Sequence, residues 1–425
     1  MIDMPFQSTI DSLLAFAYYY PLFMSYVWMC GGLYYRFHWE RGDRSTPPAL
    51  KNYPGVSVLV PCFNEAEQIE ETLRYLALLD YPNVEIICIN DGSRDNTGAI
   101  LDAQSTVYSN LRVVHLATNS GKAKALNVGA LLAKNEILVC IDSDAVLDPS
   151  AVIWLISHFE NSPRLGAVTG NPRIRNRSTL LGKIQVGEFS SIIGLIKRAQ
   201  RIYGRIFTVS GVVVAFRRAA LQRIGFWHSN TVTDDIDVSW RLQLDHWDVR
   251  YEPNALCWIL MPETYTGLWR QRLRWARGGA EAALRYAGVM AQWRSRRMWL
   301  VFIEYWLSVV WSYVLAAIVI LWLLGKFVTL PEALHVPTIV PGWHGVVLAS
   351  TCLLQFFVSL VIDGRYEPRL LRNFFWMIWY PLAYWLITVF TTVVAVPRTI
   401  FNRKHVGTWV SPDRGVRAAP VEASK

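Results

Sequence analysis

The sequence predicts an α/β fold in which a Rossmann-like domain lies between helices that span a membrane. Two observations lead to this prediction. From residue 56 to about residue 141, short and almost uninterrupted apolar runs alternate with amphipathic stretches, and long apolar tracts fill the first 36 and the last 130 positions. Hydrophobic residues make up 52% of the 425 residues and aromatic residues 13%. Such a distribution is typical of a membrane-bound enzyme or transporter.

Four tracts are long enough to cross a bilayer, because about 20 apolar helical residues span a hydrocarbon core of roughly 30 Å. They cover residues 12–35, 299–325, 343–362 and 373–396. No basic stretch precedes the first tract, and the residues before and at its start include Asp3 and Asp11. We therefore interpret the first tract as a retained anchor and not as a cleaved signal peptide.

The positions of arginine and lysine predict how the chain crosses the membrane. Three arginines follow the first tract within nine residues, which places the N-terminus outside and the central domain in the cytosol. The basic loop 363–372 is then inside, and 326–342, with a single lysine, is outside. Four full crossings would put the basic C-terminal tail outside, against the rule. Either Pro381 marks a re-entrant or tilted element, or the tail is an exception.

Charge and cysteine content limit the kinds of partner. The formal charge of +9 suits anionic lipid headgroups and a phosphorylated substrate. No nucleic-acid-binding module is visible, so we expect no nucleic-acid partner. The six cysteines show no CxxC spacing, and no disulfide or zinc site is predicted.

Four apolar runs predict strands that are buried on both faces of a parallel sheet. The runs are VSVLVP (56–61), VEIICIN (84–90), LRVVHL (111–116) and EILVCI (136–141). The helical stretches EQIEETLRYLALL (67–79) and KAKALNVGALLA (122–133) lie between them. Ligands of such sheets bind beyond the carboxyl ends of the strands, so the residues that follow each run are the first candidates for a site.

Acidic and polar residues follow these runs. Asp142 and Asp144 flank one serine, so in an extended chain both carboxylates point to one side, where they could share a divalent cation that neutralises a diphosphate. An ordinary loop after a strand is the alternative. Asp91 lies in an Asp-Gly turn, and Asn64 and Glu65 precede a helix, so turn and capping roles stay open beside nucleotide contacts.

Two further helix starts carry charged candidates. Lys122 follows a Ser-Gly pair, but Leu116 stands where a Walker A loop needs glycine, so a P-loop is excluded. A lysine at a helix start can still meet a phosphate. Asp234 and Asp235 open a predicted helix with Thr233 as N-cap. A functional carboxylate at this position would be a general base near a substrate hydroxyl.

The segment LWRQRLRWARGGAE (268–281) is rich in arginine and tryptophan. Helical spacing puts Gln271, Arg274 and Trp275 on one face, which could stack on a sugar and grip a diphosphate. The alternative is an interfacial helix whose arginines face anionic lipid and whose tryptophans lie at the headgroups. We expect Arg270 and Arg272 to face the anionic lipid headgroups.

Four ordered elements carry a family resemblance. NDGS (90–93), DSDA (142–145), TDD (233–235) and QRLRW (271–275) resemble the D, DxD, TED and QxxRW elements of processive inverting glycosyltransferases, the family of cellulose, chitin and hyaluronan synthases. The resemblance covers about 56–281 and implies a cytosolic GT-A (Rossmann-like) glycosyltransferase domain inserted between transmembrane helices. Asp234 stands where this family usually has Glu.

Longer segments are similar to the bacterial poly-β-1,6-N-acetylglucosamine synthases within this family. They are residues 168–204, 252–264, 271–281 and 409–415, so the similarity extends over nearly the whole chain. The implied organisation is an N-terminal anchor and linker, a catalytic domain, interfacial helices, transmembrane helices and a tail, at 1–50, 51–262, 263–298, 299–397 and 398–425.

The resemblance also implies a role for each nucleotide-binding candidate. The uridine would be held by Asn64, Glu65 and Asp91, with Lys122 near the nucleotide. The diphosphate and a divalent cation, Mg²⁺ or Mn²⁺, would be bound by Asp142 and Asp144.

The acceptor side follows in the same way. The resemblance makes Asp235 the catalytic base, while Gln271, Arg274 and Trp275 would close over the diphosphate and the acceptor sugar. The implied reaction polymerises N-acetylglucosamine from UDP-N-acetylglucosamine into poly-β-1,6-N-acetylglucosamine and translocates it across a bacterial inner membrane as biofilm exopolysaccharide. A chitin-oligosaccharide or hyaluronan-type synthase is the alternative. The implied partners are the sugar nucleotide, the growing polysaccharide, membrane lipid and a short two-helix membrane protein.

Overall fold

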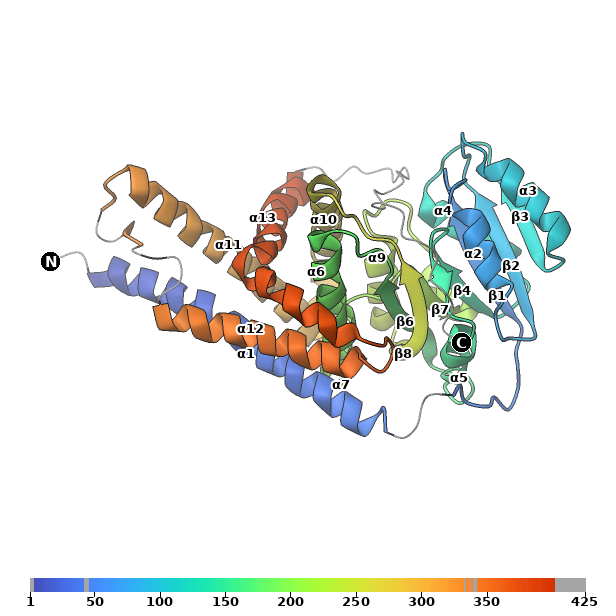
Figure 1. Cartoon of the computed structure of the whole chain (residues 1–425), viewed down its shortest axis with the longest axis horizontal. Coiled ribbons are helices and arrows are strands. Elements are labelled where there is room, and N and C mark those ends of the chain that lie inside the picture. Colours follow the sequence, from blue (N-terminus) through green and yellow to red (C-terminus); the bar gives the residue numbers. More distant parts are fainter. Residues whose placement is uncertain (1–3, 42–45, 332–333, 337, 339–341, 402–425) are drawn as a thin grey trace.

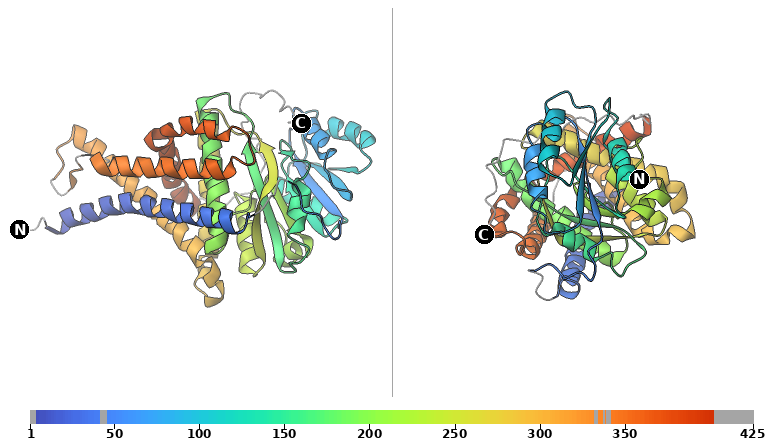
Figure 2. Two further views of the ribbon diagram at one scale, coloured as in Figure 1. Left: turned by 60° about the horizontal axis from the view of Figure 1, so that its bottom comes forward. Right: turned by 90° about the vertical axis from the view of Figure 1, so that its right-hand side faces the viewer.

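The computed structural model describes residues 4–41, 46–331, 334–336, 338 and 342–401. Figure 1 shows a sheet with helices on both of its faces at one end of the molecule and a group of long helices at the other. Figure 2 shows the long N-terminal helix and the helix that ends at Asp363 extending side by side away from the sheet.

The sheet has eight strands in the order β3-β2-β1-β4-β7-β6-β8-β5. Their bounds are β1 Val56–Cys62, β2 Val84–Asn90, β3 Leu111–His115, β4 Ile137–Ile141, β5 Val146–Leu147, β6 Leu165–Ile174, β7 Val213–Arg217 and β8 Asp248–Ile259. The four predicted strands are confirmed: β1 pairs in parallel with β2 and β4, and β2 pairs in parallel with β3. The carboxyl ends of these strands therefore share one edge.

Burial on both faces explains why these runs are apolar throughout. In β1, Val58 and Val60 pack into one hydrophobic cluster, and Leu59 between them packs into a second cluster on the other face. All three side chains are fully buried. A polar residue at any of them would lose its contacts with water without gaining a partner.

The second half of the sheet lies beyond the four runs for which the sequence predicted parallel strands, and it contains antiparallel pairs. β7 runs antiparallel to β4 and β6, and β5 runs antiparallel to β8, while β6 and β8 are parallel. Helices still separate β5 from β6, β6 from β7 and β7 from β8, but an antiparallel neighbour needs no right-handed crossover, so the strand directions in this half vary. The fold is thus a mixed sheet within an α/β domain.

Helices cover the sheet and continue into the apolar part. Those of the domain are α2 Ile69–Leu76, α3 Thr97–Val107, α4 Lys122–Leu132, α5 Ala151–Ser157, α6 Leu180–Phe189, α7 Ile196–Tyr203, α8 Arg218–Ile224, α9 Asp234–Leu244 and α10 Tyr265–Met290. A π-helical segment, η1 Ser190–Leu195, joins α6 to α7. The apolar helices are α1 Met4–His38, α11 Trp299–Phe327, α12 Gly342–Asp363 and α13 Trp385–Phe401, with η2 Trp293–Met298 before α11.

Three helical segments are long and apolar enough to cross a membrane, within 11–38, 293–327 and 343–363. The fourth predicted tract, 373–396, is not one helix. It divides into a 3₁₀ segment, η4 Leu370–Trp379, a π-helical segment, η5 Tyr380–Tyr384, and α13. Pro381 lies in η5, where its missing N–H and its ring prevent a regular helix. Of the two alternatives left open by the charge pattern, this interruption favours a re-entrant or tilted element.

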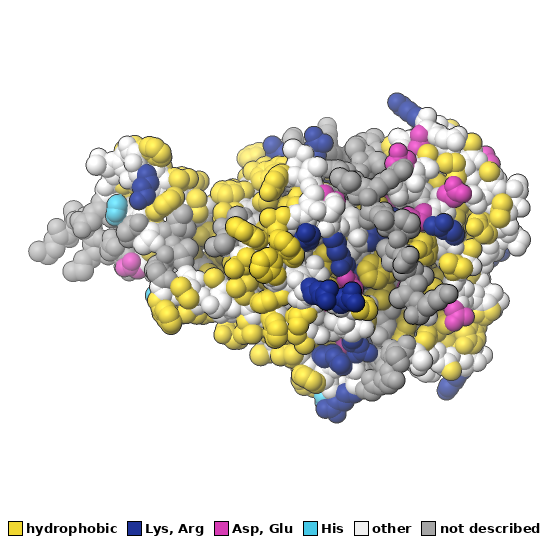
Figure 3. Space-filling model, viewed as in Figure 1, with side chains coloured by type: hydrophobic (Ala, Val, Ile, Leu, Met, Phe, Trp, Pro, Cys, Tyr) yellow, Lys and Arg dark blue, Asp and Glu magenta, His cyan; other side chains and the backbone are white. Residues whose placement is uncertain are grey.

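A buried ion network joins the domain to the membrane helices. Arg198 of α7 bonds Glu40, just after α1, at 2.6 Å and Asp363, the last residue of α12, at 2.9 Å. Arg173 of β6 bonds the same Asp363 at 2.8 Å and Glu367 at 3.1 Å. We call these five residues the junction network. Figure 3 shows hydrophobic side chains over the helices at the left and centre of the view, with arginines and lysines gathered where these helices meet the domain.

Candidate active site

The loops after β1, β2 and β4 contact one another, as their parallel order requires. Asn64 accepts a hydrogen bond from the Arg94 N–H at 2.9 Å through its side-chain oxygen, and its own N–H donates to Ser93 Oγ at 3.0 Å. Thr72 Oγ1 donates to the Ser143 carbonyl at 2.8 Å. Three segments that are far apart in the sequence thus form one rim at the edge of the sheet.

The Asn64–Glu65 pair shapes the first loop. Asn64 has φ 54°, a left-handed conformation that asparagine tolerates better than most residues. Glu65 is almost fully buried, and its N–H donates to Thr97 Oγ1 at 2.8 Å. Asp95, which the sequence patterns did not single out, accepts from Ala66 N–H and from Thr97. Burial would raise the pKa of Asp95, but these hydrogen bonds lower it below its usual value.

Asp91 lies at the centre of the rim and is fully buried. One carboxylate oxygen accepts from the Ser120 N–H at 2.8 Å and the other from the Gly121 N–H at 2.7 Å. These bonds fix the loop that leads into α4. The position of Lys122, the first residue of that helix, therefore depends on Asp91.

Lys122 reaches from α4 to the end of β4. Its Nζ bonds Asp142 Oδ1 at 2.5 Å. Burial would lower the pKa of Lys122, but the carboxylates of Asp142, Asp234 and Asp235 together raise it. The lysine is therefore charged and brings the strand end and the start of α9 into one electrostatic cluster. Asp144, on the same strand end, is half-buried.

Asp235 lies in the first turn of α9, where its Oδ1 accepts from the Ile236 N–H at 2.9 Å. A Cβ built on Gly211 would lie 3.6 Å from both Asp235 Oδ2 and Lys122 Nζ, so the loop before β7 lies against both groups. Burial and the neighbouring Asp234 raise the pKa of Asp235 to about 6, against the opposing effect of Lys122 and Arg274. A carboxylate of this kind is ionised at neutral pH and is more basic than an ordinary aspartate.

Helix α10 packs directly on the start of α9. A Cβ at Gly278 would lie 2.0 Å from Thr233 Oγ1, so only glycine permits this approach. Thr233 is at the predicted N-cap position, but its side chain makes no capping hydrogen bond. The close packing brings the exposed Arg274 near enough to Asp235 to lower the pKa of that carboxyl.

The other two candidates on α10 lie deeper. Gln271 Nε2 is 3.7 Å from Met261 Sδ, and its side-chain oxygen is buried without a hydrogen-bond partner among the described residues. Trp275 is half-buried against Phe189 of α6, with ring centroids 6.3 Å apart. Figure 1 shows α6 and α10 crossing side by side between the sheet and the apolar helices.

The expected lipid-facing position of Arg272 is wrong. This side chain is only 5% exposed and bonds Glu188 of α6 and, at 3.3 Å, Tyr384 Oη of η5. Its guanidinium also lies over the Trp275 ring, 4.4 Å from the centroid. The reason is that α10 has packed neighbours, α6 and η5, on the side where the sequence suggested lipid. Arg270 is exposed.

Comparison with known proteins identifies the family of the chain. The model of the family described as "Glycosyltransferase like family 2" matches residues 54–278, which is more than half of the chain. The chain belongs to this glycosyltransferase family. The matched segment runs from the start of β1 to Gly278, where α10 meets α9, and so includes every candidate site residue.

Curated relatives are similar over almost their whole length. The chain is 40% identical over 404 residues to a poly-beta-1,6-N-acetyl-D-glucosamine synthase of Staphylococcus epidermidis, covering 94% of this chain and 98% of the relative. It is 39% identical over the same coverage to a synthase of the same name from Staphylococcus aureus.

A solved structure agrees in fold. A mannosyltransferase from Pyrobaculum calidifontis, in complex with GDP-Man and Mn²⁺, matches with a TM-score of 0.63 over 94% of this chain and 100% of that one, at 19% identity. This likeness confirms the predicted GT-A-like glycosyltransferase fold.

The residues at the DxD element fit a hard divalent cation. Asp142 and Asp144 supply carboxylate oxygens and both are partly exposed. Within the described part of the chain, no group of three or more His, Cys, Asp or Glu side chains could hold a metal. Mg²⁺ often takes one or two carboxylates and completes its shell with water and substrate phosphates. The chemistry of Asp142 and Asp144 is therefore compatible with a divalent cation whose remaining ligands would be water and substrate phosphates.

Two residues near Asp235 were not predicted. Gly211 is one of them: a Cβ built on it would lie 3.4 Å from Asp235 Cβ, and a single glycine in a sequence does not indicate such a neighbour. Lys197 of α7 is 3% exposed, and its Nζ donates to Ser210 Oγ at 2.6 Å, next to Gly211. Burial lowers the pKa of Lys197 to about 7, although Asp235 acts to raise it. A lysine inside the apolar segment SSIIGLIKRAQ was the available clue.

Proposed function

We propose that the chain is a processive, inverting glycosyltransferase that polymerises N-acetylglucosamine from UDP-N-acetylglucosamine into poly-β-1,6-N-acetylglucosamine. The observation that carries this proposal is the placement of Asp235, a half-buried carboxylate with a raised pKa, beside Lys122 and within electrostatic reach of Arg274. A base and two cations converge from three different helices. The names and the coverage of the curated relatives support the choice of sugar and linkage.

The proposed chemistry is a single displacement. Asp235 accepts the proton of the 6-hydroxyl group of the terminal sugar, and the oxygen attacks the anomeric carbon on the face opposite the UDP. The bond from that carbon to the diphosphate breaks, so an α-linked donor gives a β-link. No covalent sugar–enzyme intermediate forms in this scheme.

Charge that develops on the departing UDP needs fixed cations. Lys122, held by Asp142, and Arg274, held by α10, supply two positive charges without reorganisation during the reaction. Asp142 and Asp144 would hold Mg²⁺ or Mn²⁺, which neutralises diphosphate charge when bound. Asn64, Glu65 and Asp91 would form or support the uridine pocket, and Gln271 and Trp275 would contact the acceptor sugar.

We further propose that the domain lies in the cytosol at the bacterial inner membrane and that the apolar helices carry the product outward. Three crossings with the N-terminus outside leave the basic tail inside, so the re-entrant reading of the segment around Pro381 satisfies the positive-inside rule. Membrane lipid and a short two-helix membrane protein are the proposed partners of these helices.

The test is synthesis by the purified chain in lipid nanodiscs with UDP-N-acetylglucosamine and Mg²⁺. UDP release and the linkage of the polymer are measured. Asp235→Asn should lower turnover by about 10³-fold while UDP binding remains, because only the base is removed. Asp80→Asn, at an exposed aspartate that is not among the candidate site residues, is the control.

Each outcome has a defined meaning. A polymer with β-1,6 linkages made from this donor alone supports the proposal. A β-1,4-linked product or a requirement for a second sugar nucleotide would assign the chain to a chitin or hyaluronan type instead. Polymer made at the normal rate by Asp235→Asn would remove this residue from the role of base.

A further inference from the structure

Two adjoining cavities lie outside the active site, where α7 and α9 end and where η2 leads into α11. Their volumes are about 490 and 530 Å³. Five arginines line each cavity, and Arg164, Arg296 and Arg297 line both, together with His246. We call the two cavities together the arginine pocket. The proposed glycosyltransferase reaction uses none of these residues.

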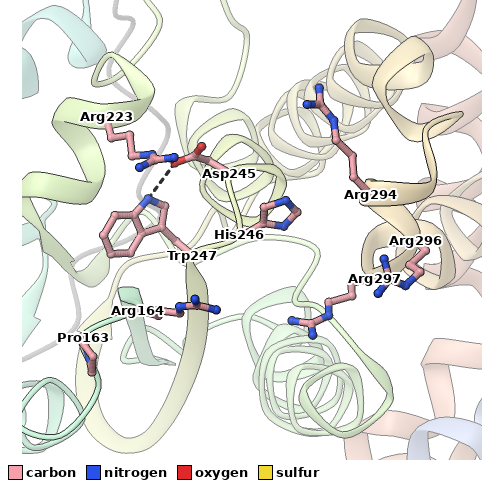
Figure 4. Close-up of a pocket in the computed structure, with 9 residues that line it drawn as sticks. All are labelled: Pro163, Arg164, Arg223, Asp245, His246, Trp247, Arg294, Arg296 and Arg297. Atoms are coloured by element: carbon pink, nitrogen blue, oxygen red, sulfur yellow. Dashed lines mark hydrogen bonds and ion pairs between the residues drawn. The ribbon is translucent and has the colours of Figure 1, made fainter.

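The pocket is assembled from distant parts of the chain. Arg164 precedes β6, Arg201 lies near the end of α7 and Arg205 follows that helix. Arg223 comes from α8, and Arg294, Arg296 and Arg297 come from η2. Figure 4 shows Arg164 and Arg297 pointing toward one another across the cavity, with His246 beside them. His246 has φ 66° and ends the turn after α9, which directs the following chain into β8.

The positive charge of the pocket is only partly balanced. Asp245 bonds Arg223 at 2.6 Å, and Asp248 bonds Arg201 at 2.9 Å and Arg205 at 3.2 Å. These two aspartates are the carboxylates among the lining residues, so most of the arginines have no acidic partner in the cavity.

The arginines shared by both cavities show the imbalance directly. Within the described residues, the guanidinium groups of Arg164 and Arg297 make no hydrogen bond or ion pair. Burial lowers the pKa of Arg205 despite Asp248, and the nearby Arg297 and Arg201 lower it further. Cations that repel one another in this way form a ready site for an anion.

The rim of the pocket is apolar and exposed. Leu300, the second residue of α11, is 60% exposed, and Trp293, at the start of η2, is 69% exposed and lies under the Arg296 guanidinium at 5.3 Å. Tyr203, on the same rim, donates from its hydroxyl to the Val27 carbonyl of α1 at 3.0 Å. The pocket therefore opens at the base of two helices that are long and apolar enough to cross a membrane.

We propose that the arginine pocket binds the phosphate ester of an acidic phospholipid headgroup. Guanidinium groups match phosphate oxygens with paired hydrogen bonds, and Arg164 and Arg297 point toward each other across a cavity that both of them line. A free phosphate would meet the same arginines. The exposed apolar rim distinguishes the two sources, because it gives acyl chains a surface that a soluble anion does not need.

The experiment uses the full chain in maltoside detergent at constant ionic strength. Dioctanoyl-phosphatidylglycerol, dioctanoyl-phosphatidylcholine and inorganic phosphate are titrated separately, and the thermal unfolding midpoint is measured. A ligand that binds only the folded state raises this midpoint in a saturable manner. We expect the rise with phosphatidylglycerol alone. An equal rise with inorganic phosphate would overturn the lipid source.

Substitutions then locate the effect. Arg164→Gln/Arg297→Gln should raise the half-saturating concentration of phosphatidylglycerol by about tenfold or more, since two charged contacts are lost. The control, Arg74→Gln/Lys134→Gln, removes the same charge at exposed positions of the sheet domain. It should change the half-saturating concentration of phosphatidylglycerol by less than about twofold. UDP release in phosphatidylcholine nanodiscs shows that each variant is folded. Unchanged lipid affinity in a folded Arg164→Gln/Arg297→Gln variant would overturn the site.

Discussion

Two of the arginines of helix α10, two positions apart, have opposite surroundings. Arg272 is buried between Glu188 and Tyr384 and bonds both of them inside the protein. Arg274 is exposed and acts electrostatically on Asp235 from the open side of the active site. The same residue type therefore holds elements together in one place and remains available to a substrate in the other.

The same contrast separates two larger regions. In the junction network, Arg198 and Asp363 have no exposed surface, and each bonds more than one partner of opposite charge or polarity. At the candidate catalytic edge, formed by the residues that follow β1, β2 and β4 and by the start of α9, Lys122 and Asp142 form a close pair, but each keeps about a quarter of its side-chain surface exposed. Buried ion pairs thus join the apolar helices to the domain, whereas the pair at the candidate catalytic edge remains accessible from solvent.

The largest effect should come from breaking the pair on the buried side. Arg272→Met leaves Glu188 buried without its cation, so the free energy of unfolding should fall by about 3–5 kcal/mol. Thermal unfolding of the purified chain in detergent measures this. Arg272→Met/Glu188→Gln removes both charges and should recover a substantial part of the loss. If the single variant were as stable as the parent, the pair would not contribute to holding α10 on α6.

The same substitution at the exposed Arg274 should lower the turnover rate and leave the free energy of unfolding almost unchanged. Arg274→Met should lower turnover by about 10²-fold, because one preorganised cation is lost from the leaving group. The free energy of unfolding should change by less than about 0.5 kcal/mol, as for other exposed positions. UDP release and thermal unfolding are measured on the same preparation. Loss of stability without loss of turnover would assign Arg274 to the structural group with Arg272.

The candidate catalytic edge was predictable because apolar runs and helix starts, which are local features of the sequence, determine where its residues lie. Continuous apolar runs place four strand ends together, and Asp142, Lys122 and Asp235 each stand at a strand end or a helix start. The resemblance to processive glycosyltransferases added their roles.

The junction and the arginine pocket were not predictable in this way. The salt bridge between Arg198 and Glu40 joins positions 158 residues apart, and a local pattern cannot show such a pair. For the same reason Arg272 was assigned to lipid: helical spacing gives the face of a side chain but not the neighbour that covers it. The sequence left two alternatives open, a re-entrant or tilted element at Pro381 or a tail that is an exception to the charge rule. Only the structure, in which Pro381 lies in the π-helical segment η5, favours the first.

The influence of Arg274 on Asp235 should also appear in the pH dependence of kcat/KM. The proposed base, Asp235, could accept a proton only when ionised, and its pKa is about 6, so kcat/KM should fall as the pH is lowered through about 6 and lose about tenfold per unit below it. Arg274 lowers this pKa, and Arg274→Met should therefore move the acidic limb to higher pH. Arg270→Met, at an exposed position of the same helix, should leave the limb in place. If Arg274→Met left the acidic limb of kcat/KM at the same pH, Arg274 would not influence the pKa of Asp235.

The smallest effect concerns Lys197, which is as buried as the junction residues but bonds a hydroxyl and not a carboxylate. Its pKa in the folded chain is about 7, against an ordinary value of 10.5. Between these values the unfolded chain binds more protons, so folding is favoured increasingly as the pH rises from 7 toward 10.5.

Lys197→Met removes this titration. Below pH 7 the variant should be more stable than the parent, by about 1–2 kcal/mol, because a buried charge is replaced by an apolar chain of similar length. The difference should shrink as the pH is raised toward 10.5, and thermal unfolding at pH 6, 8 and 10 measures it. Lys183→Met, on α6 and only partly buried, is the control and should show no such dependence. A constant difference across this range would mean that Lys197 keeps its charge in the folded chain, as the fully paired arginines of the junction do.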